Sequence, residues 1–462
     1  MIRFLNAYFP TRTVFLGITE LLLAAVAFLL AMVFYLGPLN TRIVLSYERG
    51  GAALALVIGF IACSMHFFDL YDSMVLRSRR ETFTRLTQVL GVVCLLVAAA
   101  NVAFPATRMN HRIFLTGVAL AGGMLLAWRR LFLLVNSWPA LLEPVLVLGD
   151  GRLAHAVLEE LQTRPELGFR VVCHLTEDQD WNQRQASTNQ ACAQELQRTV
   201  EAHNIRAIVV AMGDRRGRMP VEALLELKKR GVRILDGAEL YEVFTGKVAL
   251  ESLRPSVLLF SHAFQVSRQL RLCKRLISLL VSAGCLLLVG PLMLLIAVAI
   301  RLDSPGPAIF RQKRIGKEGK PFTLYKFRSM REGVENGSHR PAAVDDERNT
   351  RLGHWLRASR LDETPQLWNI LRGDMHFVGP RPFVPDQEAI CARNIPFYSH
   401  RWAVKPGATG WAQVKRGYCA TLEDNAEKLA YDLFYIKHLS LGLDILILGK
   451  TIKALLLGRG AR

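Results

Sequence analysis

Two adjacent carboxylates, Asp362 and Glu363, stand in a strongly basic part of the sequence. Thr364 and Pro365 follow them, and this pair predicts a helix N-cap and a first helical residue. Carboxylates at that place lie near free N–H groups and the positive end of the helix dipole. Such a pair can hold Mg²⁺ against a diphosphate, and one carboxylate can attack phosphorus. The alternative is that Asp362 only caps the helix and Glu363 is solvated.

Arginines surround this acidic pair in the sequence. Their planar guanidinium groups suit phosphate recognition better than lysine does. The four nearest candidates are Arg357, Arg360, Arg372 and Arg381. Together with the two carboxylates they indicate chemistry on a phosphate ester.

A glycine-rich turn, Gly149-x-Gly151-x-x-Ala154, is a second candidate site. It follows a strand-like run and precedes a helical pattern, which is the context of a dinucleotide-binding turn. Glu177 or Asp178 could then meet a ribose. The same turn is equally expected in a parallel α/β fold that binds nothing, so both interpretations stay open.

Composition restricts the class of protein. The 462 residues are 51% hydrophobic, which excludes an intrinsically disordered chain. The net charge of +19 suits nucleic acid, phosphorylated substrates or an anionic membrane surface. The basic residues cluster beside apolar runs, which favours the membrane and argues against nucleic acid. The eight cysteines form no CxxC pair, so neither a zinc knuckle nor a disulfide framework is expected.

Four apolar runs fill the first third of the chain, each close to the ~20 residues that cross a bilayer. They are approximately residues 14–36, 52–70, 86–104 and 113–134. The connection 71–85 carries Arg77, Arg79, Arg80 and Arg85, which places it in the cytoplasm. We therefore predict a four-span transmembrane region over residues 1–138 with both ends in the cytoplasm.

Strand-like and helix-like segments alternate over residues 139–240. The strands are expected near 144–149, 170–174, 205–212 and 232–235, with helices near 152–162, 191–203 and 220–230. This alternation predicts a cytosolic Rossmann-like α/β domain with a parallel sheet. Residues 241–267 read as a connector to the last domain.

A fifth apolar run, residues 272–302, contains Gly290-Pro291. Proline removes a backbone donor and clashes with the carbonyl four residues back, so we expect a kink or break. Basic residues flank the run on both sides. A straight crossing would place one basic group on the outer face, whereas a re-entrant hairpin keeps both at the cytoplasmic headgroups. The sequence thus predicts a re-entrant helix-break-helix, with a kinked fifth span as the alternative.

Three groups of motifs over residues 268–462 closely resemble the bacterial sugar transferase family of monotopic phosphoglycosyl transferases. They are the segment 303–330 ending in Tyr-Lys-Phe-Arg-Ser-Met, the segment 356–382 with Asp-Glu and Pro-Arg-Pro, and Lys-Pro-Gly-Ala-Thr-Gly-Trp-Ala-Gln at 405–413 with Tyr-Asp-Leu-Phe-Tyr-Ile at 431–436. With four preceding spans the chain looks like a long-form member. Residues 241–261 resemble the exosortase-associated exopolysaccharide subgroup. The expected fold class is therefore a membrane protein, α plus α/β.

The resemblance implies transfer of a hexose-1-phosphate from a UDP-sugar to undecaprenyl phosphate, with release of UMP. This is the first membrane step of exopolysaccharide or O-antigen synthesis. It makes Asp362 the nucleophile, which forms an aspartyl-phosphosugar intermediate, and Glu363 the partner carboxylate. It also implies Mg²⁺ as cofactor, with Asp362 and Glu363 as its ligands.

Further residues carry over from matching motifs. Arg357 matches the arginine five residues before the nucleophile, Gly290-Pro291 matches the helix break, and the remaining positions are expected to bind substrate: Pro380, Arg381, Pro382, Lys326 and Arg328. The resemblance implies membrane lipids and a second copy of the chain as partners. It places the protein in the bacterial inner membrane with the catalytic domain on the cytoplasmic face. It does not choose between glucose, galactose and another hexose.

Two other functions were weighed. A membrane-anchored NAD-dependent enzyme that modifies nucleotide sugars would need a Tyr-x-x-x-Lys pair, and residues 205–250 contain none. A non-catalytic assembly scaffold would not need the intact acidic pair. Trp402 and Trp411 could mark either an interfacial segment or a buried aromatic cluster, and we expect the run 439–457 to lie on the bilayer or in the core.

Overall fold

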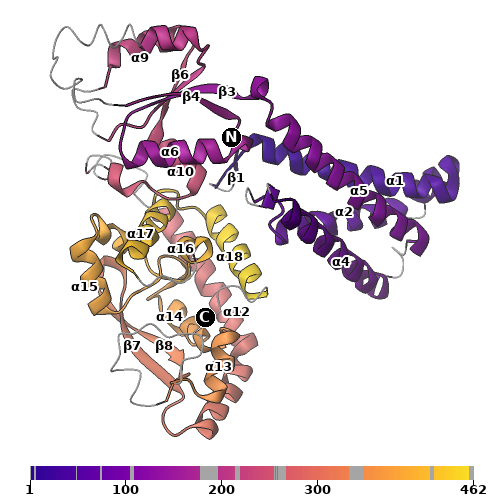
Figure 1. Cartoon of the computed structure of the whole chain (residues 1–462). Helices are drawn as coiled ribbons and strands as arrows, with labels where there is room; N and C mark the ends of the chain where they lie inside the picture. The colour runs from indigo at the N-terminus through magenta and orange to yellow at the C-terminus, as the bar shows by residue number, and fades with distance from the viewer. Residues whose placement is uncertain are drawn as a thin grey trace. The chain divides into compact units, whose positions relative to one another are not determined.

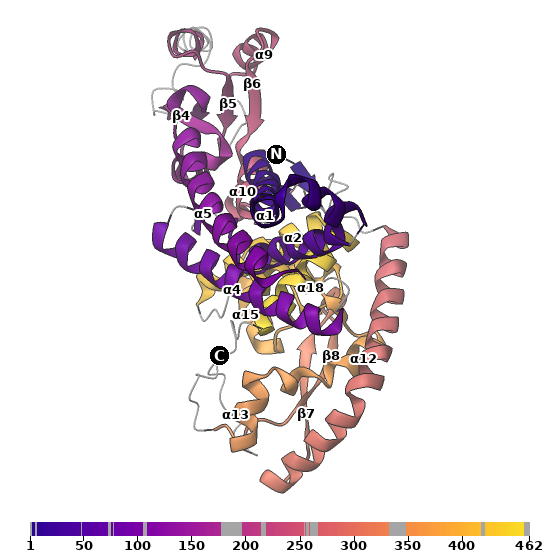
Figure 2. The same ribbon diagram turned by 90° about the vertical axis from the view of Figure 1, so that its right-hand side faces the viewer.

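A computed structural model of the chain describes residues 2–4, 7–47, 49–72, 75–76, 78–104, 109–176, 196–213, 219–253, 255, 258, 267–331, 348–416 and 421–456. The chain divides into two compact units, one made mainly of Tyr8–Gly237 and one mainly of Ala238–Arg462. Figures 1 and 2 show the elements of each unit. Five helices of the described part are long and apolar enough to cross a membrane.

Four of these five helices open the first unit, after the short paired strands β1 (Ile2–Phe4) and β2 (Ala7–Phe9). They are α1 (Thr11–Tyr47), α2 (Gly50–Phe67), α4 (Arg79–Ala103) and α5 (His111–Asn136). Each overlaps one of the four predicted apolar runs. Gly37 leaves helical dihedral angles inside α1, with φ 78° and ψ 163°. The first long helical piece therefore ends near residue 36, where the apolar run predicted its end.

A buried ion pair joins α1 to α5. Arg129 donates through Nε to Glu20 Oε1 at 2.5 Å and through Nη2 to Oε2 at 3.0 Å. Its Nη1 donates to the carbonyl of Leu70 at 3.0 Å. Both charged side chains are almost completely buried. In an apolar bundle such charges are tolerated because each neutralises the other and both are hydrogen-bonded.

A four-stranded parallel sheet follows in the first unit, as the alternating pattern predicted. Its order is β4-β3-β5-β6 and every pairing is parallel. The elements are β3 (Glu143–Leu148), α6 (Arg152–Thr163), β4 (Phe169–Leu175), β5 (Ala207–Val210), α9 (Val221–Lys229) and β6 (Arg233–Asp236), with short 3₁₀ turns η2 (Pro139–Leu141) and η3 (Pro165–Leu167). In Figure 1, α6 and α9 lie on opposite faces of this sheet. The sequence places the sheet correctly because its central strands are short, buried apolar runs.

The glycine-rich turn lies between β3 and α6, as expected. Gly149 and Gly151 both have positive φ, 128° and 87°. A Cβ at Gly149 would lie 2.7 Å from the carbonyl carbon of Ala211, so the turn needs glycine to pass the end of β5. This packing accounts for Gly149 without a ligand. Glu177 and Asp178, the candidate ribose contacts, lie outside the described residues.

The fifth apolar helix, α12 (Arg268–Asp303), begins the main part of the second unit. It continues through Pro291 as one helix, with no non-helical residue at Gly290-Pro291 (Figure 2). The break expected there is therefore not found. The lost N–H and the crowding of the carbonyl four residues back together cost about 3 kcal/mol, and the long helix accommodates both without dividing. Leu287 and Leu288 are 85% and 83% exposed, as suits lipid-facing residues. Re-entrant insertion stays a prediction, because it depends on which side of the membrane each end of α12 lies.

The remaining second unit wraps a small α/β core. Strands β7 (Ile309–Ile315) and β8 (Pro321–Phe327) pair antiparallel, and β9 (His376–Val378) pairs parallel with β10 (Gly407–Thr409). The helices are α13 (Arg351–Ala358), α14 (Gln366–Arg372), α15 (Pro385–Asn394), α16 (Trp411–Lys415), α17 (Leu422–Lys437) and α18 (Leu441–Leu456), with 3₁₀ turns η6 (Lys317–Gly319), η7 (Leu361–Glu363) and η8 (Tyr398–Ala403). Helices α13 and α14 pack against α12.

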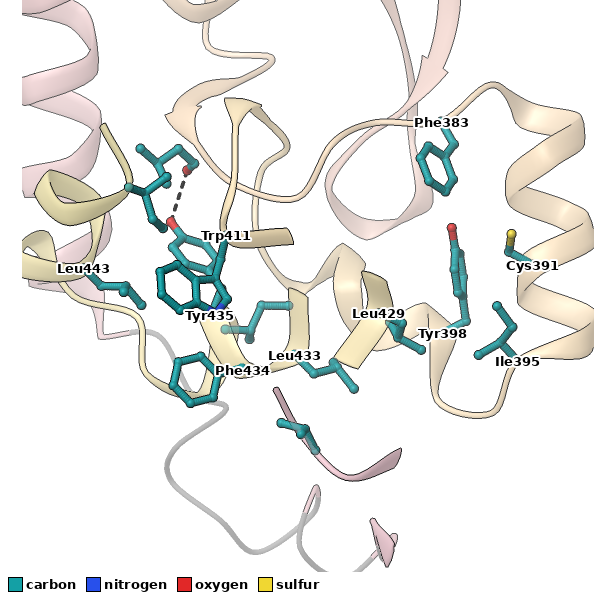
Figure 3. Close-up of a cluster of buried hydrophobic side chains, with 14 residues drawn as sticks. Phe383, Cys391, Ile395, Tyr398, Trp411, Leu429, Leu433, Phe434, Tyr435 and Leu443 are labelled. Carbon is teal, nitrogen blue, oxygen red and sulfur yellow. Dashed lines mark hydrogen bonds between the residues drawn. The ribbon is translucent and has the colours of Figure 1, made fainter. Parts of the chain in front are cut away.

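The largest apolar cluster of this unit gathers residues of α15, α17 and α18 (Figure 3). Trp411 is 4% exposed and stacks on Phe434, while Trp402 packs against the same cluster. The tryptophans thus belong to a buried aromatic cluster rather than to an interfacial segment. Leu443 and Ile447 of α18 are fully buried, so the last apolar run packs into the core, one of the two places expected for it.

The described part of the expected connector, residues 241–267, packs into the core of the second unit. It contains the end of α10 (Gly237–Thr245) and the turn η4 (Leu250–Ser252). Val248 is 2% exposed in the main apolar cluster, and its N–H donates to the carbonyl of Ala430 at 3.0 Å. Lys437 binds Glu242 at 2.7 Å. These contacts explain why the compact unit begins at Ala238.

Candidate active site

Asp362 and Glu363 lie in the tight turn η7, between α13 and α14. Arg360 precedes the turn with φ 60° and ψ 13°, the left-handed region. A residue with a side chain is strained there by about 1–3 kcal/mol, and such strain gathers at functional sites. The sharp change of direction packs η7 against β8.

The predicted N-cap at Thr364 is wrong. Helix α14 begins at Gln366, and Pro365 occupies the cap position without a side-chain hydrogen bond. The Thr364 hydroxyl donates instead to the carbonyl of Leu361 at 2.7 Å, closing the 3₁₀ turn. Because α14 has only seven residues, the charge that acts on the acidic pair comes mainly from side chains.

Asp362 is buried, at 9% exposure, yet no hydrogen bond from the described residues reaches its carboxylate. Burial raises the pKa of Asp362, and the neighbouring Glu363 charge raises it further. Lys326, Arg357 and Arg360 oppose this rise through their charges. The result is a desolvated carboxylate with no hydrogen bond from the described residues, which leaves its oxygens available for nucleophilic attack.

Glu363 is held quite differently. Its Oε1 accepts hydrogen bonds from Arg381 Nη2 at 2.8 Å and from Lys326 Nζ at 3.3 Å. Although burial acts in the other direction, Arg381 and Lys326 hold the pKa of Glu363 well below its usual range. Two adjacent carboxylates thus have pKa values pushed apart, which is how sites assign different roles to a pair of acids.

A small pocket opens beside this ion pair. Its lining residues are Arg314, Leu324, Lys326, Gln366, Arg381, Pro382 and Gly407. Burial and the charge of Arg381 lower the pKa of Arg314 to about 10, so it is still a cation at neutral pH. Three cations around one depression suit a diphosphate. In the sequence, Arg314 stands out only as one of the basic residues that follow the fifth apolar run. The two-residue period of β7, which places Gln312 and Arg314 on one face, is the signal that would have found it.

The other predicted basic residues divide into two groups. Arg357 donates to Asn349 Oδ1 at 2.9 Å, and like Arg360 it acts on Asp362 by charge alone. Arg372 is 61% exposed and lies 3.8 Å from Asp374, so the structure does not bring it to the pair.

The structure does not support the predicted role of Arg328 in binding substrate. Its side chain is 4% exposed, and its guanidinium group donates to backbone carbonyls. It donates to the carbonyls of Pro305 at 2.8 Å and Ser304 at 2.6 Å, and reaches Ile300 at 3.4 Å. Arg328 therefore caps the carboxyl end of α12, where unpaired carbonyls need donors.

The Pro380-Arg381-Pro382 loop is held at every carbonyl. Pro380 accepts from the N–H of Gly407 at 3.0 Å. Arg381 accepts from Arg401 Nη2 at 2.8 Å, and Pro382 from Arg314 Nη1 at 3.0 Å. Each proline also fixes its own φ. The loop therefore presents the Arg381 side chain to Glu363 from a rigid backbone.

The donor set allows a magnesium ion in part. Asp362 offers a carboxylate that no described residue hydrogen-bonds, whereas Glu363 Oε1 already accepts from two cations. The described residues contain no group of three metal-ligating side chains. Mg²⁺ is commonly held by one or two carboxylates and completed by substrate phosphate. The residues present fit that kind of site and no all-protein cage.

Comparison with known proteins divides the chain as the two units do. Residues 269–458 match the family model described as bacterial sugar transferase. Residues 66–235 match a model described as CoA-binding domain.

Three curated relatives carry similar names. The chain is 42% identical over 228 residues to the UDP-N-acetylgalactosamine-undecaprenyl-phosphate N-acetylgalactosaminephosphotransferase of Aeromonas hydrophila, covering 48% of this chain and 52% of that protein. It is 34% identical to the UDP-glucose:undecaprenyl-phosphate glucose-1-phosphate transferase of Escherichia coli (strain K12), covering 67% and 66%. It is 43% identical to the enzyme of the same name from Caulobacter vibrioides, covering 40% and 69%. The chain thus spans between half and two thirds of the first two.

Proposed function

The chain belongs to the bacterial sugar transferase family, and from this premise we propose that it transfers a sugar-1-phosphate from a UDP-sugar to undecaprenyl phosphate. The observation that carries the proposal is the contrast within the acidic pair. Asp362 is buried and receives no hydrogen bond from the part of the chain that the structure describes, while Arg381 and Lys326 both donate to Glu363.

The first half of the reaction uses Asp362 as nucleophile. A carboxylate oxygen attacks the β-phosphorus of the UDP-sugar, the bond from that phosphorus to the bridging oxygen breaks, and UMP leaves with the bonding electrons. Arg314, Lys326 and Arg381 line the pocket and stabilise the charge on the departing phosphate. Asp362 and Glu363 would hold Mg²⁺ together with phosphate oxygens of the substrate, and the bound ion would supply further charge neutralisation.

The second half returns the carboxylate. An oxygen of undecaprenyl phosphate attacks the phosphorus of the aspartyl-phosphosugar, the bond to the Asp362 oxygen breaks, and undecaprenyl-diphospho-sugar forms. Because the two anionic substrates enter in turn, one pocket serves both. The proposal places the second unit at the cytoplasmic face of a bacterial inner membrane, where UDP-sugars are available. Anionic lipids and a second copy of the chain are the further partners we propose.

The test is a half-reaction with the full chain in membrane vesicles. A panel of UDP-glucose, UDP-galactose and UDP-N-acetylgalactosamine, labelled in the sugar, is supplied without lipid acceptor. We expect about one UMP per active site and label bound to Asp362 with one of these donors. Asp362→Asn should lose the adduct and about 10³-fold or more of the turnover. Asp303→Asn, an exposed aspartate at the end of α12, is the matched control. Turnover retained by Asp362→Asn refutes the nucleophile. NAD-dependent conversion of the UDP-sugar into another nucleotide sugar, without release of UMP, would assign the chain to the alternative of an enzyme that modifies nucleotide sugars.

A further inference from the structure

A buried lysine on the membrane helix reaches the backbone beside the active site. Lys274 of α12 is 7% exposed. Its ammonium group contacts Asp444 Oδ2 at 2.7 Å, the hydroxyl of Tyr435 and, at 3.4 Å, the carbonyl of Val378. An ammonium group has three N–H donors, and these are three acceptors from three different elements.

Tyr435 completes this cluster. Its hydroxyl lies 2.8 Å from Asp444 Oδ1 and 3.1 Å from the carbonyl of Val378, the latter drawn in Figure 3. Burial keeps the pKa of Tyr435 well above its ordinary value, so the hydroxyl holds its proton. If that proton goes to Asp444, Lys274 is the donor left for Val378. We call Lys274, Tyr435, Asp444 and the Val378 carbonyl the lysine cluster.

The same stretch of α12 also holds the other side of the site. Arg275 donates to the carbonyls of Ile370 at 2.6 Å and Leu371 at 2.7 Å, in the last turn of α14. Helix α14 follows the acidic pair almost directly. Helix α12 therefore binds both the segment that follows Asp362 and Glu363 and the segment that precedes Arg381.

The path from Val378 to Arg381 is short and stiff. Gly379 donates its N–H to Thr409 at 2.9 Å. A Cβ at Gly379 would lie 2.5 Å from the carbonyl oxygen of Lys405, so the backbone is pressed against the neighbouring strand segment. Pro380 then fixes its own φ. We expect a displacement of Val378 to be passed on to Arg381, because the two residues between them are both restrained.

We propose that Lys274 is a positioning residue: its contact with Val378 fixes the loop that places Arg381 on Glu363, and so couples the membrane helix to the active site. This inference rests on the proposed function and adds a residue that contacts neither substrate nor the acidic pair. Small misplacements of reacting groups cost rate steeply, which makes such coupling measurable.

The experiment separates positioning from stability. Lys274→Met alone leaves Asp444 buried and unpaired, and is expected to unfold at a lower temperature. The double variant Lys274→Met with Asp444→Asn removes both charges, which is often close to neutral for stability. We expect the double variant to unfold near the wild-type temperature, yet to release UMP about tenfold more slowly with little change in KM for the UDP-sugar. Lys274→Arg keeps a cation and should recover part of the rate.

Lys320→Met is the matched control, because this lysine is 78% exposed and forms a surface ion pair with Glu318. Its rate and unfolding temperature should equal those of the wild type. A double variant that is as stable and as fast as the wild type overturns the positioning role. If the double variant is unstable, Lys274→Arg and Lys274→Met are compared at a temperature where both are folded. A higher kcat with arginine than with methionine, at unchanged KM, supports the proposal, and equal kcat values contradict it. If the wild type itself releases no UMP, the proposed function fails first, and independently of Lys274.

Discussion

Removing the Arg381 guanidinium should cost far more activity than stability. In Arg381→Met, Glu363 loses the 2.8 Å hydrogen bond and keeps only Lys326 at 3.3 Å. A hydrogen bond between charged groups is worth about 1.5–3 kcal/mol. The Arg381 side chain is 35% exposed, so water screens the pair and the low end, about 1.5 kcal/mol, applies. For a unit of this size that corresponds to a fall in Tm of about 3–6 °C.

The expected effect on rate is larger. A preorganised donor that stabilises charge in the transition state is worth about 10²–10³ in kcat. Arg381→Lys should fall in between, since lysine keeps the charge but loses the planar two-donor geometry. The assay is UMP release from the UDP-sugar, with thermal unfolding of the same preparations measured well below and through Tm.

Arg372→Met provides the control for this prediction. Arg372 is 61% exposed and 3.8 Å from Asp374, so its loss should change stability by less than about 0.5 kcal/mol and leave the rate unchanged. UMP release by Arg381→Met within threefold of the wild-type rate, on a folded protein, would show that Arg381 does not act on the reacting phosphate. A loss of rate only in proportion to a loss of folded protein would have the same meaning.

Two further predictions concern acidity and helix capping. Because burial and Glu363 raise the pKa of Asp362, activity should rise with pH along an acid limb centred above the ordinary aspartate value. Lys326→Met should move that limb to higher pH, since the charge of Lys326 opposes the rise in pKa. A pH profile of kcat/KM for UMP release checks this, and a limb that stays or moves down contradicts it. Arg328→Met should lower the free energy of unfolding by about 3 kcal/mol, because several carbonyls at the end of α12 lose their donor, while KM for the UDP-sugar stays unchanged. Thermal unfolding and KM are measured together. A raised KM at unchanged Tm would show that Arg328 binds the substrate after all.

The elements of the first unit could be predicted well from the sequence. Apolar runs of membrane length and short buried strands are local signals, since lipid and a parallel sheet both demand continuous apolar residues. The exception on the membrane side is Gly290-Pro291. Local rules favour a break there, yet α12 continues as one helix of 36 residues that contains Pro291.

The candidate site shows where local reasoning stops. Glu363 and Arg381 belong to the same group of motifs, although they are 18 residues apart in the chain. The types of these residues alone indicated phosphate chemistry. The resemblance assigned different roles to Asp362 and Glu363, but the residue types alone do not show what distinguishes their surroundings. Both are carboxylates in one tight turn, and only the fold brings Lys326 and Arg381 to one of them.

The apolar runs and the motifs that place this chain in its family can be read from its residues in order. Which arginine meets a carboxylate and which caps a helix depends on how the chain folds. Arg328 and Arg381 look alike in a basic sequence, yet one is buried on backbone carbonyls and the other faces Glu363. The physical reason is that charge acts through distance and burial, and both are set by residues that lie far apart in the chain.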